Sequence, residues 1–169
     1  MLVSNSKTRE LTAKNLVEEL MTETFSLYVV DEEALPTELD TLSDQEKYDV
    51  LVGAIESDGS LNGSIEMSVD DFVDALEAID GYIEGDRFLP VNAMNNSPYD
   101  VLGKNSDCPY FGYFGPGDAQ RVFNALSDIP EDTIDLIESF ESHAEVFYAL
   151  RDAAMDAVDA GYALAIVHS

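Results

Sequence analysis

Apolar residues near the C-terminus follow a helical spacing and then form a continuous run. The apolar residues Phe147, Leu150, Ala154 and Val158 recur every three or four positions, which predicts one face of a helix. A capping box between Ser142 and Glu145 predicts that this helix begins at Ser142, and Gly161 is a typical left-handed stop. The uncharged run 162–167 predicts a strand that is covered on both faces, in an inner position of a sheet.

The same two patterns assign the rest of the chain mostly to helices. Helices are expected in residues 8–21, 43–55, 68–79, 97–103, 117–126 and 130–140, with Ser43 and Ser68 as caps. A strand is expected over 25–30, an extended segment over 110–114, and a turn with a possible short strand over 81–90. Residues 31–42 are expected to form a loop or at best a short helix, and loops are expected at 58–63, 92–97 and 104–109.

Length and composition favour one folded domain. The chain has 169 residues, of which 46% are apolar, which is enough for a substantial core. Residues 1–7 are polar and are expected to form a tail, and residues 8–169 show no linker or internal repeat. We therefore expect a single α+β domain in which helices pack on a small mixed or antiparallel sheet.

The charge of the chain is strongly one-sided. Asp and Glu number 35 against 8 Lys and Arg, which gives a net charge of −27 and a pI near 4.1. Most carboxylates must therefore be exposed, and such a surface disfavours nucleic acids and anionic membranes. Three explanations remain open: adaptation to a salty solvent, recognition of a basic partner (a nucleic-acid mimic included), or calcium binding.

Further sequence features concern location and assembly. Cys108 is the single cysteine, so no internal disulfide forms, and residues 1–10 contain no apolar signal core. The chain contains no apolar window of membrane-spanning length. We expect a cytoplasmic protein that is a monomer or a weak oligomer, because the high charge opposes self-association.

Residues 58–71 partly match a calcium-binding EF-hand loop, which needs oxygen ligands at alternate positions and an acid at position twelve. A loop that starts at Asp58 places Val69 at position twelve. A loop that starts at Ser60 places Asp71 there, but puts Ile65 where glycine is required. We therefore expect a polar turn between two core helices, with weak calcium binding through 58–71 as an alternative.

Other candidate chemistry is sparse. The glycine-rich segment 112–117 lacks a following Lys-Ser/Thr, and Asp118 would repel phosphate. His143, His168 and Cys108 are isolated, so we assign no catalytic, cofactor-binding or metal-binding residue.

The aromatic residues Tyr110, Phe111, Tyr113 and Phe114 favour a core strand over a contact surface. An enzyme of unknown chemistry would need a cleft near Tyr110–Phe114 that gathers Tyr110, Tyr113, Arg87 or His168.

Four stretches resemble the YfbM-like family of small, uncharacterised bacterial proteins, over roughly residues 25–169. The similar stretches are FSLYVVDEEAL (25–35), SVDDFVDAL (68–76), SPYDVLG (97–103) and ALAIV (163–167). Phe72 stands where many members carry Trp. The family has no established activity, so the resemblance implies an α+β fold and no site residues.

The chain has the composition of a folded domain but a large excess of negative charge, and this charge favours an interaction role. We expect a non-enzymatic interaction protein of the immunity or inhibitor type, whose acidic surface engages a basic protein partner.

Overall fold

The computed structural model describes residues 22–83, 85, 88–94 and 111–169 of the chain. In order, its elements are β1 (Glu23–Val30), η1 (Glu32–Ala34), α2 (Asp44–Asp58), β2 (Ser60–Met67), α3 (Val69–Asp80), α4 (Leu89–Met94), β3 (Gly112–Phe114), α5 (Pro116–Ser127), α6 (Glu131–Glu138), α7 (Glu141–Ala160) and β4 (Ala163–His168). The fold is α+β, as predicted. The tail 1–7, the helices expected over 8–21 and 97–103, and the loop 104–109 lie outside the described residues.

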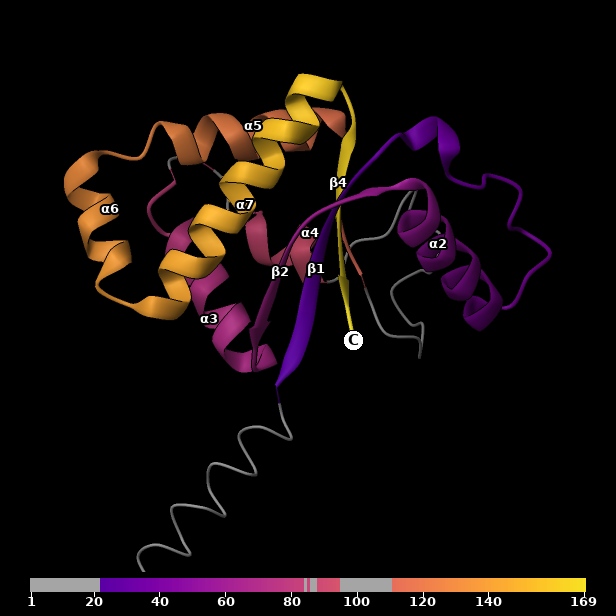
Figure 1. Cartoon of the computed structure of the whole chain (residues 1–169), viewed down its shortest axis with the longest axis horizontal. Coiled ribbons are helices and arrows are strands. Elements are labelled where there is room, and N and C mark those ends of the chain that lie inside the picture. The colour runs from indigo at the N-terminus through magenta and orange to yellow at the C-terminus, as the bar shows by residue number, and fades with distance from the viewer. Residues whose placement is uncertain (1–21, 84, 86–87, 95–110) are drawn as a thin grey trace, which may run out of the picture.

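The four strands form one antiparallel sheet in the order β2-β1-β4-β3. The sequence prediction for β4 is confirmed, because β4 lies between β1 and β3 and residues 163–167 are all buried. Figure 1 shows β4 beside β1 near the middle of the molecule. The apolar run of β4 arises because both faces of the strand are covered.

Side chains that alternate along the strands supply two cores, one on each face of the sheet. Phe25 and Leu27 of β1 belong to the larger core with α3, α5 and α7, whereas Val30 belongs to the smaller core with α2. Figure 1 shows α2 on one side of the sheet and α3, α5, α6 and α7 on the other. The sheet is therefore the middle layer of the molecule.

The predicted caps of α2 and α3 are confirmed. Ser43 and Glu46 form a complete capping box, in which the Glu46 carboxylate accepts hydrogen bonds from the Ser43 amide and hydroxyl. These bonds lower the pKa of Glu46. Ser68 accepts from the Asp71 amide at 3.1 Å and begins α3.

The predicted cap of α7 is wrong by two residues, and the capping box at Ser142 does not form. The N-cap is Phe140, whose side chain makes no cap hydrogen bond, and Ser142 already lies in the first turn. The reason is the short connection, because α6 ends at Glu138 and the chain turns within two residues. The predicted stop is confirmed, since Gly161 adopts a left-handed conformation with φ 72°.

Two predicted irregular segments are regular structure instead. The segment expected as a polar turn at 58–63 leads into β2, which pairs with β1 and shifts register beside Asn62. Only Ile65 and Met67 of β2 are buried, so the alternation of buried and exposed residues covers just the end of the strand. The Gly, Asn and Ser residues before it are typical of turns, and they hid the strand from sequence analysis.

Residues 89–94 form helix α4 rather than the strand or loop expected there. The backbone amides of Phe88 and Leu89 at its start donate to the Asp80 carboxylate, at 3.3 and 3.4 Å. A side chain from another helix therefore begins α4, which the local sequence does not reveal.

Candidate functional site

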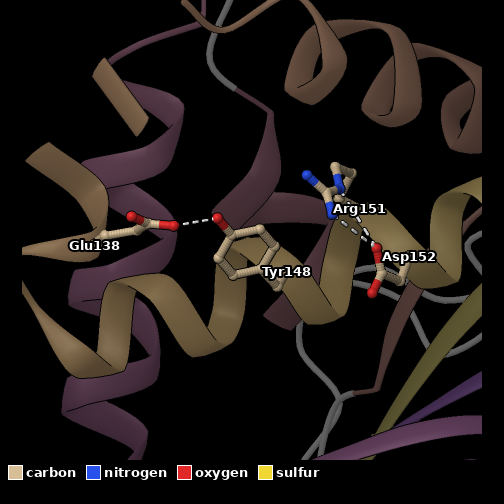
Figure 2. Close-up of polar contacts among 4 residues, drawn as sticks. All are labelled: Glu138, Tyr148, Arg151 and Asp152. Atoms are coloured by element: carbon tan, nitrogen blue, oxygen red, sulfur yellow. Dashed lines mark hydrogen bonds and ion pairs between the residues drawn. The ribbon is translucent and has the colours of Figure 1, made fainter. Parts of the chain in front are cut away.

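Basic side chains in the described residues are Lys47, Arg121 and Arg151. The guanidinium of Arg121 lies 3.8 Å from the centre of the Phe88 ring. Arg151 lies 4.8 Å from the centre of the Tyr148 ring and pairs with Asp152 at 3.2 Å (Figure 2). These three cations offset only a small part of the negative charge of the described residues, and Arg121 and Arg151 also lie over aromatic rings.

Exposed carboxylates cover both outer layers of the molecule. On the α2 side they are Glu33, Glu38, Asp40, Asp44, Glu46, Asp49, Glu56 and Asp58. Helices α3, α6 and α7 on the other side carry Asp70, Asp71, Asp74, Glu77, Glu131, Asp132, Asp135, Glu138, Glu141, Glu145, Asp152, Asp156 and Asp159. This distribution follows no single stripe, so it does not favour the phosphate-like spacing of a nucleic-acid mimic.

One region combines these acids with exposed apolar side chains. We call it the α6–α7 corner and define it by Asp135, Leu136, Glu138, Phe140, Glu141 and Glu145. Leu136 and Phe140 are 56% and 59% exposed, although both are large and apolar. Apolar side chains ringed by charged ones are typical of protein interaction sites.

Helices α6 and α7 are linked at this corner by a hydrogen bond. The Tyr148 hydroxyl donates to the Glu138 carboxylate, and Figure 2 shows the two side chains pointing toward each other. This bond is the main reason that the pKa of Tyr148 is raised. The contact fixes the position of one carboxylate of the corner relative to α7.

Partial burial and neighbouring carboxylates both disfavour the charged form of Glu145. Its pKa is raised, first by partial burial and then by the carboxylates of Glu141 and Glu66. A raised pKa means that the carboxylate form is held in an unfavourable environment. A cation beside Glu145 would relieve this cost, so the corner is electrostatically suited to a basic group.

A pocket of about 290 Å³ lies where α3 and α5 end. Its lining residues are Tyr82, Ile83, Ala125, Asp128, Ile129 and Pro130. Tyr82 and Ile83 follow α3, and Asp128 is the C-cap of α5. The pocket therefore combines apolar walls, one tyrosine ring and one carboxylate.

Asp80 is the buried charged residue of the described core, with 2% exposure. One carboxylate oxygen accepts from the start of α4, and the other has no hydrogen-bond partner among the described residues. Its position between α3 and α4 identifies Asp80 as a structural cap within the larger core.

The aromatic segment is part of the core, as the sequence analysis favoured. Phe111, Tyr113 and Phe114 are buried, and the Tyr113 hydroxyl donates to Glu32 at 2.5 Å. Tyr110, Arg87 and Cys108 lie outside the described residues.

The structure does not bring Tyr113 and His168 together. Tyr113 pairs with Ala165 and packs in the smaller core. His168 stacks on Phe25 of the larger core, with ring centres 5.7 Å apart, and contacts Glu23 at 2.9 Å. The two residues lie on opposite faces of the sheet, so they do not share the cleft that the enzyme alternative needs.

Residues 58–71, which the calcium alternative treats as one ligand loop, do not form such a loop. Its central residues form β2, and a strand advances about 3.3 Å per residue. The proposed ligands Ser60 and Asp71 are therefore separated along an extended chain, and Asp71 is hydrogen-bonded to Ser68 at 2.8 Å. Asn62 donates to Asp156 of α7. No group of three or more His, Cys, Asp or Glu residues in the described parts of the chain is arranged to hold a metal ion.

His143 lies in the first turn of α7, half-buried, with its ring 5.0 Å from that of Phe140.

Within the described ranges, every helix is too short or too polar to cross a bilayer.

Comparison with known proteins yields no match to a family model, to a curated protein or to a solved structure. The resemblance to the YfbM-like family therefore stays a prediction.

Sequence reasoning missed both the corner and the pocket. Tyr82 and Asp128 are far apart in the sequence and meet only because α3 and α5 end side by side. No local signal marks the pocket, because every described helix lacks a basic residue in its last turn. At the corner, the signal is an aromatic residue, Phe140, at a position where Ser or Asp is usual.

Proposed function

We propose that this protein binds a basic protein partner through the α6–α7 corner, as an immunity or inhibitor protein does. The observation that carries the proposal is the exposure of Leu136 and Phe140 among carboxylates. Adaptation to salt explains carboxylates anywhere on the surface. Leu61 of β2 and Val91 of α4 are equally exposed, at 59% and 61%, but they lie on separate elements. Leu136 and Phe140 instead lie four residues apart where α6 meets α7, among carboxylates, and adaptation to salt does not explain this pairing.

The two kinds of side chain have different roles in such a complex. The carboxylates attract the basic partner over a distance of about 10 Å at moderate salt and accelerate its encounter. Burial of Leu136 and Phe140 then slows dissociation, with a contribution of about 1–2 kcal/mol each. The partner surface is therefore expected to combine Lys or Arg with an apolar depression.

The test begins with capture of partners from lysate of the source organism at low and then moderate salt. A captured basic protein is purified, and its stoichiometry and affinity are measured by isothermal titration calorimetry. We expect one partner per chain and an affinity that falls as salt rises. The variant Asp135→Asn/Glu141→Gln/Glu145→Gln is expected to weaken binding at least tenfold.

A matched control removes the same charge elsewhere. Asp49→Asn/Glu56→Gln/Asp58→Asn lies on α2, across the sheet from the corner (Figure 1). We expect this control to weaken binding much less than the corner variant. Equal losses in the two variants, or no basic protein captured from a folded sample, would contradict the proposal.

The alternative is a salt-adapted exterior without a partner at this corner. It is favoured by the spread of carboxylates over both outer layers. Under this alternative, added salt still stabilises the protein by screening the repulsion between carboxylates. The corner variant and the α2 variant, however, behave alike in every binding assay.

A further inference from the structure

The pocket between the ends of α3 and α5 has the character of a cation site. We propose that it accepts the side chain of a lysine, with the aliphatic stem on the apolar walls and the ammonium group at Asp128. This inference rests on the proposed function, because it assigns one lysine of the basic partner to a defined position.

The electrostatic argument concerns two helix ends. The C-terminal end of a helix carries a partial negative charge and is stabilised by a nearby cation. Helix α3 ends with Asp80 and α5 has Asp128 as its C-cap, and both lack a basic residue in the last turn, as does every other described helix. These two ends are distinguished by lining one pocket together. Two negative helix ends and an exposed carboxylate thus meet at the pocket, and the helices themselves supply no cation there.

The walls of the pocket match an aliphatic chain. Ile129 is 6% exposed and forms a fixed apolar wall, together with Ile83 and Pro130. Tyr82 is 43% exposed, so its ring is accessible to a cation at the pocket mouth. A volume of about 290 Å³ lies at the lower limit for small-molecule sites and suits one side chain.

The neighbouring arginine is already engaged. Arg121 lies one helical turn before Ala125 on α5, and its guanidinium lies 3.8 Å from the centre of the Phe88 ring. Lysine is the expected guest because a compact ammonium with three donors can be shared between a carboxylate and helix carbonyl groups. A guanidinium instead prefers to lie in the plane of one carboxylate and donate two parallel hydrogen bonds to it.

The experiment is an NMR titration of the full chain with Nα-acetyl-lysine amide. We expect saturable, millimolar binding with shifts at Tyr82, Ala125 and Ile129. Nα-acetyl-norleucine amide, which has the stem without the charge, is expected to bind at least fivefold more weakly. Asp128→Asn should weaken binding of the lysine derivative at least fivefold, and Ala125→Leu should abolish it by filling the pocket.

The controls separate this site from general attraction to an acidic surface. Asp49→Asn makes the same charge change on α2 and should leave the binding unchanged. Equal binding of norleucine, tighter binding of the arginine derivative, or unsaturable shifts spread over the surface would each overturn the lysine assignment. Because Asp128 is exposed, Asp128→Asn remains informative if Ala125→Leu does not fold.

Failure here is distinguishable from failure of the proposed function. If a partner binds the corner but the lysine derivative does not bind the pocket, only this inference is wrong. If the lysine derivative binds but no basic protein is captured, the partner proposal is wrong and the pocket is a site for a small ammonium compound.

Discussion

Phe140 departs from local rules of helix formation more clearly than its neighbours. It occupies the N-cap of α7 with no side-chain hydrogen bond, and it is 59% exposed. An N-cap normally carries Ser, Thr, Asp or Asn, because a side-chain oxygen satisfies a free amide of the first turn. Residues that break a local rule without a structural gain are common at functional sites.

Phe140→Ser is therefore expected to stabilise the protein while weakening its binding. We expect the free energy of unfolding to rise by about 0.5–1 kcal/mol, because serine caps α7. Affinity for a captured partner should fall about tenfold, because an apolar anchor is lost. Urea denaturation and calorimetry measure the two effects separately.

The control for this residue is Val50→Ser, which removes an exposed apolar side chain from α2. It should leave partner affinity unchanged. A drop in stability of Phe140→Ser would show that the ring has a structural role, for instance through its contact with His143.

Among the elements, the short strand β3 depends on close approach of α4. A Cβ atom added to Gly112 would lie 2.2 Å from the carbonyl oxygen of Ala93, which is backbone and cannot rotate away. Glycine is required here because of this contact and not because of its own φ angle.

We expect Gly112→Ala to lower the free energy of unfolding by about 1–3 kcal/mol, as overpacking does. Gly53→Ala is the matched comparison, since no atom lies within 4 Å of the added Cβ in the middle of α2. That change should raise stability by about 0.5–1 kcal/mol, because alanine favours the helix. Urea denaturation measures both, and equal effects would contradict the packing of α4 on β3.

For the whole molecule, charge repulsion sets how stability responds to salt and pH. The pKa of Glu145 is raised in the folded protein by partial burial and by Glu141 and Glu66. Since the folded state holds this proton more tightly than the unfolded state, stability falls as pH rises from the ordinary glutamate pKa through the raised value. Screening by salt reduces the repulsion.

Glu145→Gln is therefore expected to raise the melting temperature at pH 7, with the gain shrinking below the ordinary glutamate pKa. Adding KCl should stabilise the wild-type protein more than this variant. Glu46→Gln is the control of opposite sign, because hydrogen bonds from Ser43 lower the Glu46 pKa and contribute stability that is lost as pH falls. Thermal melts across pH and KCl concentration measure all three proteins, and a loss of stability in Glu145→Gln at pH 7 would contradict the charge crowding.

The sequence by itself determined the elements whose signals are local. The capping residues Ser43 and Ser68, the stop at Gly161 and the apolar run of β4 each depend on neighbours within a few residues. The uniform apolar character of β4 also identified its inner place in the sheet, because only a strand covered on both faces has this composition.

Only the tertiary structure decided the elements and sites that depend on distant residues. β2 is a strand because β1 offers it a partner, and α4 begins where the Asp80 side chain supplies its cap. The pocket forms because two helices end side by side, and the corner forms because a short connection exposes Phe140. Contacts between residues far apart in the chain leave no periodic signal in the sequence, so the candidate sites became visible only when the chain was folded.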